Sequence, residues 1–269
     1  MKLSKAIEIL EASGIESARH DAMEIFLELG GVGRSELLLC DIDSSSEAVA
    51  VAIKRRAERE PLQYILGKCY FYNEVYEVNP SVLIPRSDTE ILVDFACKNI
   101  PVGEKFVDLC TGSGCVGIST LKNTKSTSAA LVDISADALA VAKRNAELNG
   151  VLDRVDFVRA DVLCDTVDGE FFAVLSNPPY VKNEVYKTLE REIFHEPSIA
   201  FLGGDDGCDF YREITRKYKN KISRQGFIAY EIGYDQSEDL TLIAEKEGMT
   251  CQIIKDFSGN DRVAVLRWK

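Results

Sequence analysis

The sequence predicts an α/β protein whose core is a doubly wound, mostly parallel seven-stranded sheet, preceded by a small helical bundle and a β-hairpin. Three observations support this prediction. Apolar residues recur at helical spacing over the first sixty residues, aromatic and β-branched residues surround Asn73, and strand-like and helix-like segments alternate after Pro85. We therefore expect three parts: a helical domain at 1–61, a hairpin linker at 62–85 and an α/β domain at 86–269.

The N-terminal domain is predicted to contain three short amphipathic helices. Apolar residues share one face of the first helix, which ends near Gly14, and the same pattern predicts a second helix that ends near Gly30. A third helix is expected to begin where Ser44 and Glu47 have the spacing of a capping box, and to end before Pro61.

The α/β domain is predicted from strands that alternate with helices, because such strands pair in parallel and carry helices on the faces of their sheet. The helices are expected near 87–97, with Ser87 and Glu90 as a capping pair, and at 115–122 and 135–150. A turn of only four residues, SGND, separates the last two strands, so we expect this pair to be antiparallel and to lie at one edge. The expected strands are 105–109, 129–133, 155–161, 172–177, 226–233, 250–257 and 262–268.

Composition restricts the class of protein. The 269 residues are 46% hydrophobic and 28% charged, as in soluble globular proteins, and no apolar run approaches the roughly 20 residues of a membrane helix. The first residues mix charged with apolar side chains, unlike a signal peptide, so we expect a cytoplasmic protein with no membrane partner. A formal charge of -12 argues against a broad phosphate-binding surface and disfavours nucleic acid as the substrate.

Cysteine usage predicts neither disulfides nor a metal site. The eight cysteines, Cys40 among them, are scattered without a CxxC pair, and the chain has only two histidines. We therefore expect reduced thiols.

A glycine-rich loop follows the first strand of the α/β domain. Gly112, Gly114 and Gly117 satisfy G-x-G-x-x-G between a strand and a helix, where glycines allow a sharp turn and close approach of a ligand to a helix N-terminus. Asp133 ends the next strand, where its carboxylate can accept hydrogen bonds from both hydroxyls of a ribose. The sequence thus predicts a nucleotide-like ligand; the structural alternative is a tight turn, with Asp133 capping the helix that starts near Ala136.

The other acids distinguish between two nucleotide-like ligands. Asp108 precedes the glycine loop, and Asp161 ends the third strand, where it can accept from the amino group of adenine. Several carboxylates suit a cationic sulfonium and would repel the pyrophosphate of NAD. The pattern therefore favours S-adenosyl-L-methionine, and a nucleotide-binding dehydrogenase remains as an alternative that rests on the glycines alone.

The stretch NPPY, from Asn177 to Tyr180, ends the fourth predicted strand, at the edge where open parallel sheets bind ligands. An amide or amino nitrogen attacks poorly because its lone pair is delocalised, and two acceptors facing its NH₂ group would orient that lone pair. The side-chain oxygen of Asn177 and the carbonyl of Pro178 suit this task, while Tyr180 can stack on a planar amide or base. Proline fixes its own backbone φ and has no donor, so Pro178 and Pro179 hold the carbonyls in place.

At these residues the sequence resembles the HemK/PrmC family, methyltransferases that modify the side-chain nitrogen of the glutamine in the GGQ motif of class I peptide chain release factors. NPPY alone also occurs in DNA adenine-N6 methyltransferases, and the family resemblance extends over nearly the whole chain. It is carried by the segments EREPLQYILG, FYNEVYEVNPSVLIPRSDTE, VDLCTGSGCVGIS, VDISADALAVAKRNA, SNPPYV, EPSIAFLGGDDGCDFYR and DFSGNDRVAVLRW.

The resemblance implies a Rossmann-like class I methyltransferase that converts S-adenosyl-L-methionine to S-adenosyl-L-homocysteine and supports translation termination. It implies that Asn177, Pro178, Pro179 and Tyr180 hold the glutamine amide, and that the N-terminal domain docks the release factor. Cys110 stands where many members of the superfamily have the first glycine of the loop, and Val162 where some relatives have an aromatic residue; we expect altered affinity at most, with the backbone contacts retained. The implied cofactor contacts are Asp108, Cys110, Thr111, Gly112, Ser113, Gly114, Asp133, Asp161, Val162 and Asn177.

Three further features have two interpretations. His195 could be a general base, although an amide that attacks a sulfonium needs no prior deprotonation, so we expect His195 not to be catalytic. Arg86 could flank a helix or reach the site. The basic run Lys54, Arg55, Arg56, Arg59 could be a solvated helix face or a contact for a protein or RNA. Methylation of nucleic acid, and binding without catalysis, remain as alternative functions.

Overall fold

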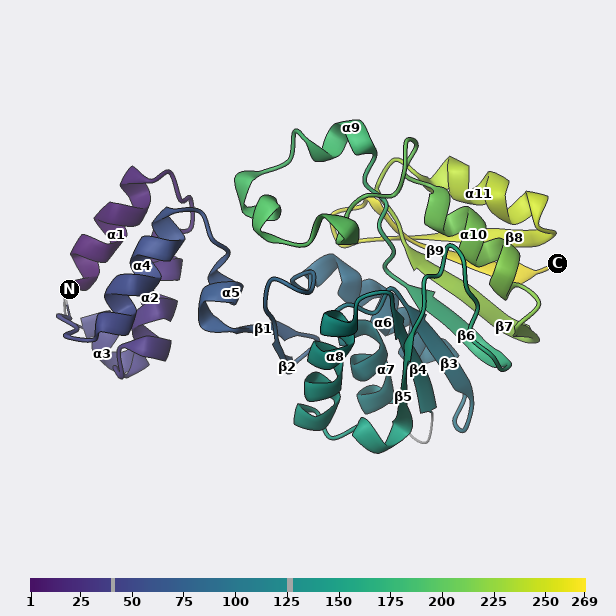
Figure 1. Ribbon diagram of the computed structural model, residues 1–269, viewed down its shortest axis with the longest axis horizontal. Coiled ribbons are helices and arrows are strands. Elements are labelled where there is room, and N and C mark those ends of the chain that lie inside the picture. The colour runs from purple at the N-terminus through teal and green to yellow at the C-terminus, as the bar shows by residue number, and fades with distance from the viewer. Residues whose placement is uncertain (40–41, 125–127) are drawn as a thin grey trace. The chain divides into compact units, whose positions relative to one another are not determined.

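The computed structural model describes residues 1–39, 42–124 and 128–269 (Figure 1). The chain forms two compact units, and Cys40 lies outside the described residues. The helical unit consists of Met1–Lys68 and Glu190–His195, and the sheet unit consists of Cys69–Leu189 and Glu196–Lys269. Across the described ranges, no helix combines the length and the apolar character that crossing a membrane requires.

The helical unit contains the three helices that the sequence predicts, and their apolar faces share one core that includes Leu10, Phe26 and Ile53. Two further helices were not predicted, because six and five residues are too few to show a helical period. The helices are α1 (Leu3–Ala12), α2 (Ala18–Leu29), α3 (Arg34–Leu39), α4 (Glu47–Ala57) and α5 (Leu62–Leu66), and the segment 190–195 adds the 3₁₀ helix η3 (Arg191–His195).

Both predicted capping boxes are wrong. Ser46 is the residue before α4, and the Ser44 hydroxyl accepts from the Ser46 amide at 3.2 Å instead of capping the helix. In the sheet unit, a 3₁₀ turn, η1 (Ser87–Thr89), precedes α6 (Glu90–Asn99), and Glu90 accepts from the amide of Tyr72 at 2.9 Å. The Ser44 hydroxyl thus has a partner two residues along the chain, and Glu90 has one 18 residues earlier; the spacing of the residues shows neither partner.

The predicted hairpin is present at Asn73. Strands β1 (Lys68–Phe71) and β2 (Glu74–Glu77) flank Tyr72 and Asn73, whose φ values of 50° and 66° give the two left-handed residues of a tight hairpin turn. Phe71 and Tyr76 are buried in the core of the sheet unit, so the hairpin packs with that unit.

The sheet has the predicted seven strands in the order β5-β4-β3-β6-β7-β9-β8. The first five strands in this order pair in parallel, and β9 is antiparallel to both of its neighbours, so the prediction of an antiparallel pair at one edge is confirmed. The strands are β3 (Lys105–Leu109), β4 (Ser128–Asp133), β5 (Val155–Arg159), β6 (Phe171–Ser176), β7 (Ile222–Glu231), β8 (Met249–Lys255) and β9 (Asp261–Trp268).

Helices cover both faces of this sheet because successive strand residues point to opposite sides. Phe106 of β3 joins the core beneath α6, α7 and α8, whereas its neighbour Val107 joins the core beneath α10 and α11. The elements not yet given are α7 (Cys115–Asn123), α8 (Ala136–Leu148), η2 (Leu152–Arg154), α9 (Asn183–Tyr186), η4 (Ser198–Ala200), α10 (Asp209–Tyr218) and α11 (Ser237–Lys246). The doubly wound fold is thereby confirmed.

Candidate active site

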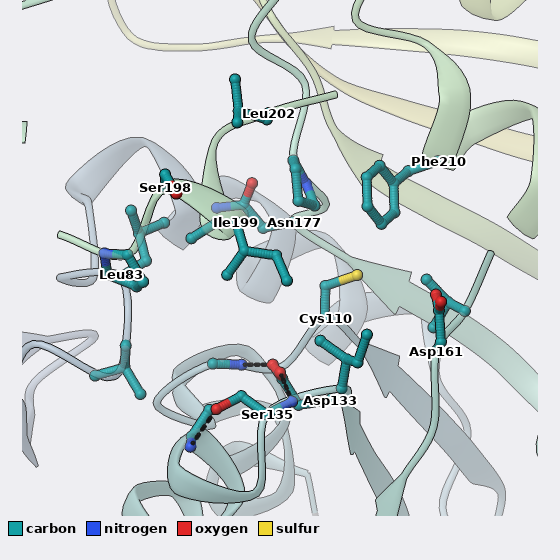
Figure 2. Close-up of a pocket in the computed structure, with 18 of the residues that line it drawn as sticks. Leu83, Cys110, Asp133, Ser135, Asp161, Asn177, Ser198, Ile199, Leu202 and Phe210 are labelled. Carbon is teal, nitrogen blue, oxygen red and sulfur yellow. Dashed lines mark hydrogen bonds between the residues drawn. The ribbon is translucent and has the colours of Figure 1, made fainter. Parts of the chain in front are cut away.

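A cavity of about 800 Å³ lies in the sheet unit, lined by residues that follow the carboxyl ends of β3, β4, β5 and β6 (Figure 2). The strand order reverses between β3 and β6, and open α/β sheets bind their ligands at such a switch point. A smaller hollow shares Cys110, Gly112 and Asn177 with this cavity. The predicted residues that line the large cavity are Cys110, Gly112, Asp133, Asp161, Val162, Asn177 and Pro179.

The loop after β3 has a backbone conformation that favours glycine. Cys110, Gly112 and Gly114 have φ values of 59°, 53° and 83°, and Gly114 is the residue before α7. The left-handed region costs a residue with a side chain roughly 1–2 kcal/mol, so Cys110 is strained where a glycine would not be. Burial raises the pKa of the Cys110 thiol well above its ordinary value, which keeps it neutral and fits a packing role.

Asp108 lies behind this loop. Its carboxylate is 1% exposed and accepts from the Thr111 hydroxyl at 2.5 Å and from the Gly117 amide at 3.0 Å. Burial raises the pKa of Asp108 to about 7. Asp108, Thr111 and Ser113 line only the smaller hollow, and Gly114 lines neither, so none of these four predicted contacts lines the large cavity.

Asp133 joins the glycine loop to the end of β4. Its Oδ2 accepts from the Gly112 amide and its Oδ1 from the Ser135 amide, each at 2.9 Å (Figure 2). The hydroxyl of Ser135 caps α8 by accepting from Ala138 at 3.1 Å, so Asp133 is not the cap. A carboxylate has about four acceptor positions, and Asp133 therefore retains capacity for ligand hydroxyls.

Asp161 and Val162 form the turn after β5. Asp161 Oδ1 accepts from the Leu163 amide at 2.9 Å, which fixes the turn. Val162 is buried, and its carbonyl accepts from Lys217 at 3.1 Å. The turn therefore presents a fixed carboxylate beside an apolar side chain, a combination suited to the edge and face of a purine.

The NPPY residues are held by groups that the sequence did not predict. Asn177 Nδ2 donates to the Thr89 hydroxyl at 3.3 Å, and the Tyr180 hydroxyl donates to Glu231 Oε1 at 3.2 Å. Pro178 is buried, and neither Pro178 nor Tyr180 lines the two hollows. Thr89 precedes NPPY by 88 residues and Glu231 follows Tyr180 by 51, so no local pattern connects them.

A second, apolar wall of the cavity was also missed. Leu83, Ile199, Leu202 and Phe210 line it (Figure 2). Glu196 connects two segments of this wall, because it accepts from the Ile84 amide at 2.9 Å and pairs with Arg86. The sequence signal was present in LIPRSDTE and EPSIAF, but neither shows that the two segments meet.

The three features with two interpretations can now be placed. Arg86 both pairs with Glu196 and lines the smaller hollow. His195 is exposed, belongs to the helical unit and lines neither hollow. The basic run is largely compensated within the helical unit by the ion pairs Arg55–Glu60, Arg56–Asp21 and Arg59–Glu192.

The charge of the large cavity fits a cationic ligand. Four carboxylates line it, and none of its lining residues is lysine, arginine or histidine. Such a site attracts a sulfonium and repels a pyrophosphate. The lining thus fits S-adenosyl-L-methionine better than NAD.

Comparison with known proteins gives matches in both parts of the chain. Residues 2–67 match the PrmC N-terminal domain, and residues 87–202 match the methyltransferase small domain. A release factor glutamine methyltransferase of Clostridium acetobutylicum is 41% identical over 219 residues, which cover 79% of this chain and 77% of the relative. A protein of the same name from Thermodesulfovibrio yellowstonii is 35% identical over 256 residues, which cover 92% and 91%.

Solved structures are similar in fold. A methyltransferase from Pyrococcus furiosus has a TM-score of 0.53 at 19% identity, over 72% of this chain and 89% of that one. A ribosomal protein L11 methylase from Lactobacillus delbrueckii subsp. bulgaricus has a TM-score of 0.52 at 18% identity, over 68% and 80%. The fold and the matches at both ends confirm the resemblance predicted from the sequence: this chain belongs to the family of release factor glutamine methyltransferases and is an S-adenosylmethionine-dependent methyltransferase.

Proposed function

We propose that this protein methylates the side-chain amide nitrogen of the glutamine in the GGQ motif of class I peptide chain release factors, and so supports translation termination. S-adenosyl-L-methionine would be the donor and S-adenosyl-L-homocysteine the product. Support comes from the family, from the acid-lined cavity, and above all from one contact. The NH₂ group of Asn177 donates to Thr89, which leaves the side-chain oxygen of Asn177 as an acceptor at the wall of the cavity.

This acceptor meets the requirement of amide methylation. A substrate NH₂ group that donates to the Asn177 oxygen and to the Pro178 carbonyl has its lone pair directed away from both acceptors. Orientation of this kind is worth effective molarities of about 10⁵–10⁸ M in well-aligned reactions. The attacking amide needs no prior deprotonation, since its proton can leave to water after transfer, and the chain need not supply a general base.

The cofactor would be held by the predicted contacts on the other side of the cavity. When bound, S-adenosyl-L-methionine supplies a methyl group on a cationic sulfonium. Asp133 retains acceptor capacity for ribose hydroxyls, and Asp161 and Val162 suit adenine. The loop from Cys110 to Gly114 offers backbone groups at the start of α7.

We also propose that the N-terminal helical domain, residues 1–61, docks the release factor and that residues 62–85 link it to the methyltransferase domain at 86–269. One glutamine side chain presents few atoms for recognition, so a second surface would place the GGQ loop. Compensation of the basic run by carboxylates argues that this docking does not depend on a free cationic face.

The proposed function is tested by transfer of labelled methyl from S-adenosyl-L-methionine to a purified class I release factor. The same factor with its GGQ glutamine changed to alanine, and duplex DNA, are run beside it. Label on the intact factor alone is the expected result. Label on the factor that lacks the GGQ glutamine would place the modification on another residue, and label only on DNA would replace this proposal with nucleic-acid methylation.

A further inference from the structure

A buried carboxylate lies behind the NPPY segment and has no part in the mechanism given so far. Glu231 is the last residue of β7 and is 2% exposed. Strands β6 and β7 pair in parallel with Ser176 opposite Tyr230, so Asn177 and Glu231 each follow a paired residue at the carboxyl edge of the sheet. Burying a carboxylate costs free energy unless neighbouring groups stabilise it, so the groups that contact Glu231 indicate its role.

Two neighbours of Glu231, Tyr180 and Thr89, connect it to the NPPY residues of the proposed substrate site. The Tyr180 hydroxyl donates to its Oε1 at 3.2 Å, and the hydroxyl of Thr89 also interacts with the carboxylate and lowers its pKa. Thr89 is 1% exposed and accepts from Asn177 Nδ2 at 3.3 Å. Among the described residues, Oε2 of Glu231 has no hydrogen-bond partner of normal geometry, which leaves it open to the rotatable proton of Thr89.

The chemistry of these groups determines which one donates and which one accepts in the series of hydrogen bonds from Asn177 through Thr89 to Glu231. An ionised carboxylate only accepts, so the Thr89 hydroxyl must donate its single proton toward Glu231. The Thr89 oxygen then remains an acceptor, and Asn177 must turn its NH₂ group toward it. The Asn177 oxygen is thereby kept free, and the opposite orientation of this amide, which has nearly the same shape, is disfavoured.

Other charged and titratable groups surround Glu231. Arg262 lowers the pKa of the carboxylate and Asp88 raises it, and Arg262 is itself paired with Asp88 and Asp256. The Tyr211 hydroxyl donates to the backbone carbonyl of Glu231 at 2.9 Å, and Cys115 is a neighbouring thiol. Burial is the largest influence and raises the pKa of Glu231 above its ordinary value.

We propose that Glu231 and Thr89 are positioning residues for methyl transfer: the Glu231 carboxylate orients the Thr89 hydroxyl, and Thr89 in turn holds Asn177 with its side-chain oxygen toward the substrate amide. Through Tyr180, the same carboxylate fixes the fourth residue of NPPY. This inference rests on the proposed function. Glu231→Gln would reverse the orientation of the Asn177 amide, because the new NH₂ group can donate to Thr89 and allow Thr89 to donate to the Asn177 oxygen.

The experiment measures kcat and KM for methylation of the purified release factor by the full-length protein and its variants. Glu231→Gln and Thr89→Val each keep the volume of the side chain, and we expect kcat to fall roughly 10–100-fold in both. Thr89→Ser keeps the hydroxyl and should recover most of the lost rate. Thr215→Val is the matched control, because it removes another buried threonine hydroxyl, which lies 2.9 Å from the Tyr230 hydroxyl, and should leave kcat unchanged.

A pH profile separates positioning from a loss of packing. In the wild type, kcat should fall at acid pH as Glu231 becomes protonated, because a protonated carboxyl can donate to Thr89 and no longer forces Thr89 to donate to it. The kcat of Glu231→Gln should be lower than that of the wild type and should not fall further at acid pH. Unfolding temperatures above the assay temperature for every variant would show that each rate belongs to folded protein.

The two proposals fail in different ways. A wild-type protein that leaves the factor unlabelled would overturn the proposed function and this inference together. An active wild type with an unchanged kcat in Glu231→Gln would overturn the inference alone. The same holds if the kcat of Glu231→Gln still falls at acid pH, or if Thr89→Ser is as impaired as Thr89→Val.

Discussion

The backbone amide of Gly112 donates a hydrogen bond of 2.9 Å to Oδ2 of Asp133, which connects the loop after β3 to the end of β4. The other oxygen, Oδ1, accepts from Ser135 at the start of α8. One carboxylate thus holds two segments of the cavity wall while it keeps acceptor positions for a ligand.

Asp133→Ala should weaken the binding of S-adenosyl-L-methionine more than it weakens the fold. Each charge-assisted hydrogen bond to a ribose hydroxyl contributes about 1.5–3 kcal/mol, so loss of one bond should increase Kd roughly 10–100-fold and loss of both should increase it further. Isothermal titration calorimetry measures this directly. Asp168→Ala removes an exposed carboxylate that does not line the cavity and should leave Kd unchanged. Equal affinity in the wild type and Asp133→Ala would contradict the role proposed for Asp133.

Asn177→Ala should abolish methyl transfer to the release factor while the protein remains folded. The change removes the side-chain acceptor that would orient the substrate amide, and misplacement of a reacting group costs about 10²-fold or more. Labelled-methyl transfer and circular dichroism are the measurements. Asn149→Ala, which removes a side-chain donor to the Val75 carbonyl at 3.0 Å, should retain activity. Transfer by Asn177→Ala at the wild-type rate would remove the proposed mechanism.

Gly114→Ala should destabilise the protein more than Gly150→Ala. Both glycines have left-handed backbones, with φ of 83° and 70°, so an added Cβ strains each by roughly 1–2 kcal/mol. At Gly114 that Cβ would also lie 2.7 Å from Cδ1 of Ile118, whereas nothing lies within 4 Å at Gly150. Overpacking adds about 1–3 kcal/mol, which urea unfolding can resolve. Equal losses of stability would show that the core beneath α7 adjusts freely.

Asp108 should make stability fall as the pH rises from about 4 to 7. Burial raises the pKa of Asp108 from 3.8 to about 7 in the folded state, so over this interval the folded protein holds a proton that the unfolded chain has released. The free energy of unfolding then decreases with pH until Asp108 ionises in both states. Urea unfolding of Asp108→Asn and the wild type should therefore show a difference that grows in favour of the variant by more than about 1 kcal/mol across this range. A constant difference would show that the pKa is not raised.

Thr120→Val should stabilise the protein by about 1 kcal/mol. The Thr120 side-chain hydroxyl is buried without a hydrogen-bond partner among the described residues, and a buried unpaired polar group is costly. Thr124→Val is the matched change, because its hydroxyl donates to the Thr120 carbonyl at 2.5 Å and its loss should destabilise. Thermal unfolding of both variants checks the opposite signs, and a loss of stability in Thr120→Val would indicate a partner for its hydroxyl.

Local patterns in the sequence determined the elements and much of the candidate site. The alternation of strands and helices, the turn at Asn73 and the loop from Cys110 to Gly114 depend on the chemistry of neighbouring residues, and the structure has all three. The short helices α3 and α5 were not predicted because they are too short to show a helical period, and both capping boxes failed because the Ser44 hydroxyl and the Glu90 carboxylate have other partners. The acids and NPPY could be placed at one edge because parallel strands end together.

Only the tertiary structure decided how the site is supported. Asn177 lies 88 residues from Thr89, and Tyr180 lies 51 residues from Glu231, so their contacts depend on which strands pair. The same is true of Glu196 and Arg86, which join the apolar wall across 110 residues. Hydrophobic period and turn chemistry act over a few residues, so they fix which segments are strands and where polar groups end them. The partner of each buried carboxylate is decided when the segments pack. That pairing depends on the burial and charge of groups that are far apart in the sequence.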